Sequence, residues 1–274
     1  MIALLWLGCA APADPIDDGC GPDAPVDELL VMRALTFARP TGDTSHGFDL
    51  DGATTATGGP TGCGVADYVG VDGRPGVDNA FARLLPALEL TEAQAVEGII
   101  ATTITSGELL ITVALTDVDG PDDACVGVEV GRATGAPMLG TDGRLLPGQT
   151  FDPDPEVAAV RLDGGALRGG TLEVSGLDLT LPLTVFGEAF RLELPGASLL
   201  VTLGEDGGGE GFFAGPADTA YLASIARGEN VNPAVADVLD ALLSTHADLD
   251  ADAAGVCHDI STTFDFEAVS AFWF

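Results

Sequence analysis

Residues 171–203 read TLEVSGLDLTLPLTVFGEAFRLELPGASLLVTL and alternate apolar with polar side chains along much of their length. The alternation is clearest over residues 189–194, AFRLEL. A period of two places one set of side chains on a core and the other in water, which is typical of an antiparallel sheet with one wet face. Short strands are predicted throughout residues 157–215, and GEDGGGEG (204–211) indicates a hairpin loop between two of them.

Strands are also predicted nearer both ends of the chain. LLVMRALTFAR (29–39), ELLITVALT (108–116) and ACVGVEVGRA (124–133) are rich in apolar and β-branched residues, and the last two are expected to pair as a hairpin. The final segment, DISTTFDFEAVSAFWF (259–274), is predicted to be a strand with one apolar face. We expect this strand to rejoin an early sheet, which favours one domain over two.

Helical patterns interrupt the strands. A short helical run, NAFARLLPAL, covers residues 79–88, and a longer helix is predicted from a capping box at residues 91–94 to Ser106-Gly107. Two further helices are predicted after residue 215. The second of these begins at Asn232-Pro233, an N-cap followed by proline at the first helical position.

Together these elements predict an α+β fold. We expect a mostly antiparallel β-sheet, sandwich-like or curved, with three or four packed helices. Phe272-Trp273-Phe274 resembles the aromatic end of outer-membrane barrel strands. The predicted helices nevertheless argue against a barrel.

The charge of the chain narrows its possible partners. Among its 274 residues, 43 are acidic and ten are basic, and all ten basic residues are arginine, so the formal net charge is −33. Such a charge repels phosphate backbones and excludes nucleic-acid binding, while it attracts cations. Much of this charge is expected to be solvated surface.

The N-terminus combines an apolar segment with a cysteine. Residues 2–7 are apolar but too few to span a bilayer, and Gly8 directly precedes Cys9. This pattern resembles the lipobox of bacterial lipoproteins, although no lysine or arginine forms a basic region before it. The resemblance implies a signal segment over residues 1–8, lipidation of Cys9, an acidic proline-rich tether over 9–27 and a single domain over 28–274. It also implies an exported protein of the cell envelope, anchored by lipid to the outer membrane or cell surface.

Four further cysteines predict disulfides. An even number of cysteines in an exported protein indicates two bridges in one of three connectivities. No C-x-x-C pair is present, which argues against thioredoxin-like redox chemistry and zinc-ribbon sites. The four predicted disulfide cysteines are Cys20, Cys63, Cys125 and Cys257.

A short acidic segment, HADLDADAAGVCHD (246–259), has the spacing of a calcium loop. Calcium loops of the EF-hand type take ligands from positions 1, 3, 5, 7 and 12, with a backbone carbonyl at position 7. The segment lacks glycine at position 6 and has aspartate in place of glutamate at position 12, and it resembles the D-x-D-x-D loops of extracellular modules such as thrombospondin type 3 repeats. Its predicted calcium ligands are Asp248, Asp250, Asp252, the carbonyl of Ala254, and Asp259.

Two alternatives to calcium apply to this segment. It is equally well interpreted as a solvated acidic segment that follows a helix and binds no metal, because short motifs produce many false matches. A transition metal held by His246, Asp248 and His258 is less favoured, since two histidines and one carboxylate are few ligands.

A second acidic group lies in the long glycine-rich stretch between the first strand and residue 79. Loops of this length are usually functional or ordered by something else, and a shared cation would order this one. The chain as a whole is faintly similar to uncharacterised Asp/Gly-rich lipoproteins of high-GC bacteria, a resemblance that implies no activity. The predicted ligands of the second cation are Asp49, Asp51, Asp72, Asp78 and Asn79.

Catalytic motifs are missing from the sequence, and no G-x-S-x-G, H-E-x-x-H, Walker or dinucleotide-binding pattern occurs. With three histidines and no lysine, general-base and Schiff-base chemistry have few candidates. The sequence therefore favours a non-catalytic lipoprotein, stabilised by calcium, with a structural or binding role. One alternative is a binding protein for an apolar ligand such as a lipid, held by the alternating strands of residues 171–203. A hydrolase with converging carboxylates in a cleft is a second alternative.

Overall fold

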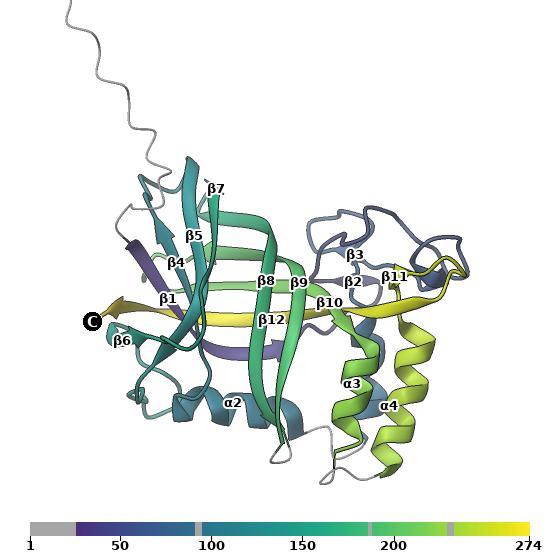
Figure 1. Cartoon of the computed structure of the whole chain (residues 1–274). Helices are drawn as coiled ribbons and strands as arrows, with labels where there is room; N and C mark the ends of the chain where they lie inside the picture. Colours follow the sequence, from purple (N-terminus) through teal and green to yellow (C-terminus); the bar gives the residue numbers. More distant parts are fainter. Residues whose placement is uncertain (1–25, 91–94, 186–187, 229–232) are drawn as a thin grey trace, which may run out of the picture.

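The structure is a computed structural model that describes residues 26–90, 95–185, 188–228 and 233–274 (Figure 1). It consists mainly of β-strands, most of them in one closed sheet. Within the described ranges, no helix is long and apolar enough to cross a membrane.

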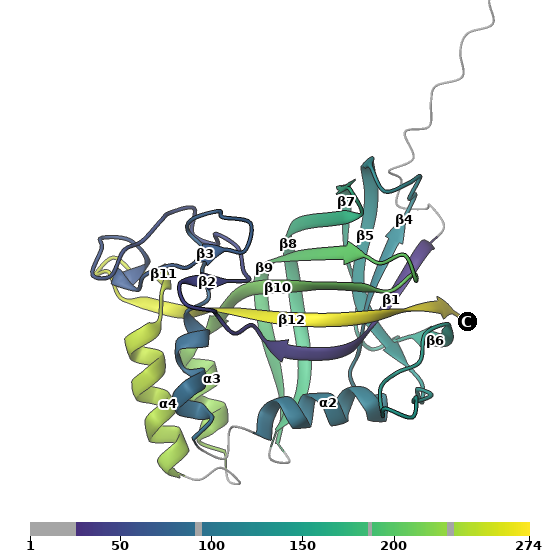
Figure 2. The same cartoon turned by 180° about the vertical axis from the view of Figure 1, so that it is seen from behind.

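Eight antiparallel strands form a closed barrel. Each strand pairs with the next, and the last pairs with the first. Figure 2 shows the barrel from behind, with the final strand crossing its whole width. In order around the barrel, the strands are β1 (Val26–Phe37), β4 (Leu110–Thr116), β5 (Asp123–Thr134), β7 (Val160–Arg168), β8 (Thr171–Val185), β9 (Glu188–Leu203), β10 (Gly209–Asp218) and β12 (Cys257–Trp273).

The predicted sandwich-like or curved α+β sheet is therefore wrong, and the argument from helices against a barrel is wrong as well. Closure depends on stagger between neighbouring strands. In β1, residues 26–31 pair with β4, whereas residues 30–37 pair with β12. Alternation along one strand is the same in an open and a closed sheet, so it does not reveal this stagger.

The remaining strands are short. β6 (Gln149–Pro153) runs parallel to β12 and also pairs with β5, and β11 (Leu249–Ala251) forms a hairpin with β12. β2 (Thr44–Ser45) and β3 (Val69–Gly70) form a small parallel pair within the long loop that follows β1. None of these four short strands was predicted from the sequence.

The helices lie outside the barrel. α2 (Val96–Ser106) packs on β1 and ends at Gly107, which has a φ of 84° and closes the helix as predicted. α3 (Thr219–Ala226) and α4 (Pro233–His246) pack together beside the far end of β12 (Figure 1). The short segments η1 (Gly62–Gly64), η2 (Ala80–Arg83) and α1 (Leu85–Leu88) complete the set. The predicted capping box at 91–94 and the predicted N-cap Asn232 lie outside the described residues.

Much of the hydrophobic core lies inside the barrel. Phe213 of β10 and Phe264 of β12 are fully buried, and their ring centroids are 5.2 Å apart. Fully buried side chains of other strands belong to the same hydrophobic cluster, including Leu30, Leu115 and Leu167. As the sequence predicts, the final strand rejoins the first one, with Phe264 opposite Phe37.

Candidate functional site

The long loop after β1 is held against the β11–β12 hairpin by a disulfide bond. Cys63 in η1 and Cys257 at the start of β12 are bonded, 194 residues apart in the chain, with a Cα–Cα distance of 6.0 Å. Figure 1 shows this loop, with β2 and β3, lying beside β11 at the end of the molecule opposite β6. The prediction that Cys63 and Cys257 form disulfides is thus confirmed. Cys125 is disulfide-bonded as well, and Cys20 lies outside the described residues.

Three carboxylates of this loop converge. Asp49, Asp51 and Asp78 each offer an oxygen atom, and these atoms lie within 4.8 Å of one another. Asp49 accepts a hydrogen bond from Gly52 N at 2.7 Å, and Asp51 accepts one from Ala53 N at 2.8 Å. These turns fix the two exposed carboxylates, and each retains a second oxygen for a ligand.

Backbone packing around the cluster requires a glycine. Gly76 has a φ of 81°, in the left-handed region. A Cβ at this position would lie 2.9 Å from Ala53 O and 3.3 Å from Asp49 Oδ2. The glycine-rich composition of the loop thus permits the close approach that brings Asp49 and Asp78 together.

Asp78 is the buried member of the cluster. It is 2% exposed, and its carboxylate accepts a hydrogen bond from Leu50 N at 2.7 Å. Burial, with a smaller contribution from the charges of Asp248, Asp51 and Asp67, raises the pKa of Asp78 to about 8. Without a compensating cation, this group therefore retains a proton near neutral pH.

Two further aspartates complete the surroundings of Asp78. Asp67 interacts with Asp78 and accepts a hydrogen bond from Thr55 N, and burial raises the pKa of Asp67. Asp248, from the other predicted acidic segment, is 4% exposed and accepts hydrogen bonds from Ser261 N and Ser261 Oγ at 2.8 and 2.6 Å. Burial raises the pKa of Asp248 to about 6. The two acidic segments, predicted as separate sites, thus meet at one junction.

The predicted ligand set for the second cation is only partly assembled. The structure brings together Asp49, Asp51 and Asp78. Asp72 is instead paired with Arg74, and the buried Asn79 uses its Nδ2 to donate to Ala38 O and Ser45 Oγ. Sequence reasoning missed Asp67, because nothing in the pattern around it distinguishes it from other acidic residues.

The predicted calcium loop at 248–259 forms a tight hairpin. Asp252 caps its own turn, accepting hydrogen bonds from Ala254 N at 2.8 Å and Val256 N at 3.0 Å, and it lies 3.5 Å from His258 Nε2. Asp248 points inward to Ser261, and Asp250 occupies the left-handed region with a φ of 56°. Among the described residues, the loop does not bring three carboxylate, imidazole or thiol ligand atoms together, whereas the Asp78 cluster does. A cation bound by Asp248, Asp250, Asp252, Ala254 and Asp259 stays a prediction.

The chemistry of the junction suits a hard cation. Within the described part of the chain, no arginine or histidine forms an ion pair with Asp49, Asp51, Asp67, Asp78 or Asp248. Calcium takes six to eight oxygen ligands in flexible geometry, and loop carboxylates supply such oxygens. A divalent ion reverses the effect of burial on these groups, because it favours their charged forms.

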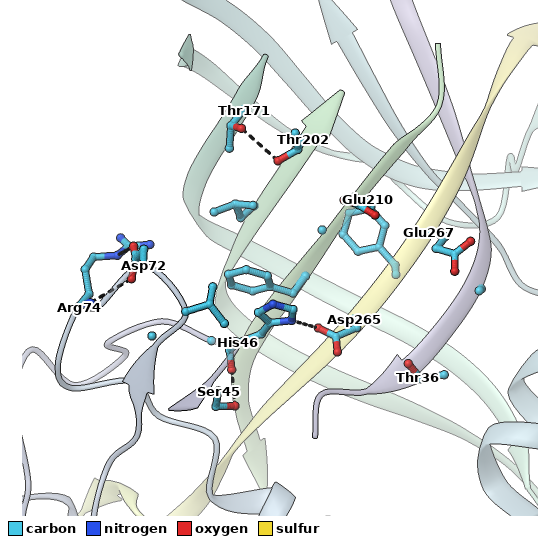
Figure 3. A pocket seen from close by; sticks show the side chains of 18 of the residues that line it. Thr36, Ser45, His46, Asp72, Arg74, Thr171, Thr202, Glu210, Asp265 and Glu267 are labelled. Atoms are coloured by element: carbon cyan, nitrogen blue, oxygen red, sulfur yellow. Dashed lines mark hydrogen bonds and ion pairs between the residues drawn. The ribbon is translucent and has the colours of Figure 1, made fainter. Parts of the chain in front are cut away.

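A second site, a cleft of about 650 Å³, lies on the outer wall of the barrel (Figure 3). His46 Nδ1 lies 2.6 Å from Asp265 Oδ1, and its ring stacks on Phe212 at 4.9 Å between centroids. The hydrogen bond to Asp265 raises the pKa of His46. Opposite this pair, Arg74 contacts Asp72, as Figure 3 shows.

The charges of this cleft are largely satisfied within the protein. Arg144 and Arg33 each lie 3.0 Å from Glu267, and the contact with Arg144 is the largest cause of the lowered pKa of Glu267. Among the described residues, Asp265 is the hydrogen-bond partner of the His46 ring, and no hydroxyl group is hydrogen-bonded to that ring. The cleft therefore holds a histidine–carboxylate pair, and the neighbouring Ser45 hydroxyl donates to the backbone carbonyl of His46.

Comparison of the chain with protein-family models, curated proteins and solved structures gave no match.

Proposed function

We propose that this chain is a non-catalytic binding protein in which a calcium ion fixes the long loop to the end of a β-barrel. The observation that carries the proposal is the convergence of Asp49, Asp51 and Asp78 within 4.8 Å. Asp67 and Asp248 surround the buried Asp78 and add further negative charge. The disulfide between Cys63 and Cys257 stabilises the same junction covalently.

Calcium is favoured over magnesium for a physical reason. Magnesium requires near-ideal octahedral geometry and gives up its water reluctantly, so dedicated all-protein sites for it are uncommon. Here the carboxylates come from separate turns, and Asp49 and Asp51 are exposed. Such an arrangement suits the variable coordination of calcium.

We also propose that the protein is exported and anchored to the cell envelope by a lipid on Cys9. Disulfides persist in oxidising compartments, so the bond between Cys63 and Cys257 supports export. Calcium sites of extracellular modules are weak, with a Kd of about 10⁻⁴–10⁻³ M. A weak site is sufficient in a compartment where calcium is abundant.

A calcium titration by calorimetry tests the site. Wild type should bind calcium more tightly than magnesium, and Asp78→Asn should abolish this preference because the amide removes the buried charge. The paired substitution of Asp250→Asn and Asp252→Asn should leave calcium binding unchanged, as should Asp163→Asn, which removes one exposed charge elsewhere on the barrel.

The outcomes separate the two candidate positions. Loss of calcium binding in the Asp250/Asp252 variant, with binding retained in Asp78→Asn, would place the ion in the 248–259 loop and refute the junction site. At about 1 mM calcium, a Kd of about 10⁻⁴–10⁻³ M stabilises the fold by about 0.4–1.4 kcal/mol. Equal stabilisation by magnesium in all variants would indicate charge screening alone.

A further inference from the structure

In the barrel wall, β7 and β8 pair at one end only and leave a gap along the rest of their length. These strands pair at two positions, Leu167 with Leu172 and Arg168 with Thr171. Beyond this point β7 follows β5 as far as Val160, whereas β8 follows β9 as far as Val185. In Figure 1, β8 and β9 extend together away from β7 and toward α3. The two edges that face the gap therefore diverge.

A cavity of about 260 Å³ lies behind this gap. Its lining includes Val160 of β7 and Leu181 of β8, which are residues of the two strands on either side of the gap. An eight-stranded barrel is just wide enough to be filled by side chains or to hold one small ligand. Deeper in the barrel, the cavity is lined by apolar side chains of six strands: Met32, Ile111, Val130, Leu179, Leu199 and Phe213.

Two arginines mark the polar part of the cavity. Seven of the ten arginines form ion pairs with acidic residues. Arg191, which lines the cavity, forms no such pair among the described residues. Arg132 also lines it and lies 3.4 Å from Asp154, while its buried Nε has no hydrogen-bond partner. Arg83, Arg168 and Arg191 form no ion pair among the described residues, and of these three Arg191 lines the cavity.

Two acidic residues share the lining with these arginines. Asp178 is engaged by the backbone, since its Oδ1 accepts a hydrogen bond from Gly196 N at 3.0 Å. Glu156 is exposed at the edge of the cavity, next to the start of β7. Arg132 Nη2 donates to Glu108 O at 2.9 Å, so among the described residues the lining donors without a partner include the guanidinium of Arg191 and Nε of Arg132.

We propose that this cavity binds a small amphipathic anion, with an apolar chain inside the barrel and a carboxylate at Arg191. The gap between β7 and β8 is the route of entry. If a methylene group occupies about as much space as a water molecule, roughly 30 Å³, the cavity accommodates roughly eight or nine carbons. A medium-chain fatty acid fits this description, and a long-chain lipid exceeds it.

Calorimetric titration with three ten-carbon probes tests the proposal: decanoate, decan-1-ol and decyltrimethylammonium. Wild type should bind decanoate best. Arg191→Gln should weaken decanoate binding by about tenfold, as expected for loss of a charged hydrogen bond, and leave decanol binding unchanged. Arg168→Gln is the matched control, because Arg168 also lacks an acidic partner among the described residues but does not line the cavity. It should bind decanoate like wild type.

A variant that fills the cavity tests whether the apolar chain of the ligand lies inside the barrel. Leu179→Trp should abolish binding of decanoate and decanol. If this variant does not fold, Val160→Phe, which fills the cavity from β7, is tested in its place. The proposal is overturned if wild type binds no probe, if the three probes bind equally well, or if both filled variants bind decanoate like wild type. An equal loss of affinity in Arg191→Gln and Arg168→Gln would also overturn it, since that result indicates general charge attraction.

Discussion

Raising the pH of calcium-free protein should destabilise the fold through Asp78. The pKa of this carboxyl group is raised to about 8 in the folded state, against an ordinary value of 3.8. Because this pKa is higher in the folded state than in the unfolded state, the folded state binds the proton more tightly. The stabilisation of the fold that results is fully present below pH 3.8. It is lost progressively as the pH rises toward and through about 8. Asp248, with a pKa raised to about 6, contributes in the same direction at lower pH.

The size of the effect follows from proton linkage. Between pH 5 and 7, the folded state holds nearly one more proton at Asp78 than the unfolded state. Each pH unit then costs about 1.4 kcal/mol, so the free energy of unfolding should fall by about 2–3 kcal/mol over this range. For this chain of 274 residues, such a loss of free energy of unfolding corresponds to a decrease in Tm of roughly 4–12 °C.

Thermal melts in chelator at pH 5, 6 and 7 measure this slope. Asp78→Asn should flatten it, because the neutral amide imitates the protonated acid and can still accept the hydrogen bond from Leu50 N. Repulsion among the remaining carboxylates also increases with pH, so Asp163→Asn serves as the control for removal of one negative charge. Calcium should raise the Tm of wild type more at pH 7 than at pH 5, since fewer protons compete for the site. Identical slopes for wild type and Asp78→Asn would refute the reasoning.

Three further predictions concern other parts of the chain. Replacing Cys63 and Cys257 together by serine should lower the free energy of unfolding by about 2–4 kcal/mol, measured by urea denaturation. An NMR titration should give His46 a pKa above its ordinary value of 6.5, and Asp265→Asn should bring it back down; an unchanged value would contradict the pairing of His46 with Asp265 in the cleft. Cys9→Ser should move the protein from the detergent phase to the aqueous phase in a partitioning assay, and no change would contradict lipid anchoring.

Local patterns in the sequence were sufficient to predict most of the strands and helices. Alternation in residues 189–194 predicts a strand, and the structure places them in β9. Gly107 ends α2 because it occupies the left-handed conformation that glycine adopts without strain. The hairpin of β4 and β5 follows from two adjacent apolar runs. Each of these features depends on a few neighbouring residues, which is why the sequence alone is sufficient.

Closure of the barrel and assembly of the acidic junction depend on distant parts of the chain. Residues 26–31 of β1 pair with β4, whereas residues 30–37 pair with β12. This stagger is a relation among three strands, so it cannot be recognised in the sequence of any one of them. The same holds for the site: Asp49, Asp78 and Asp248 become neighbours only when the loop is placed against the final hairpin. Sequence shows that these residues are acidic and near turns. Burial, which raises the pKa of Asp78, is a property of the tertiary structure, because it depends on which segments exclude water from the carboxylate.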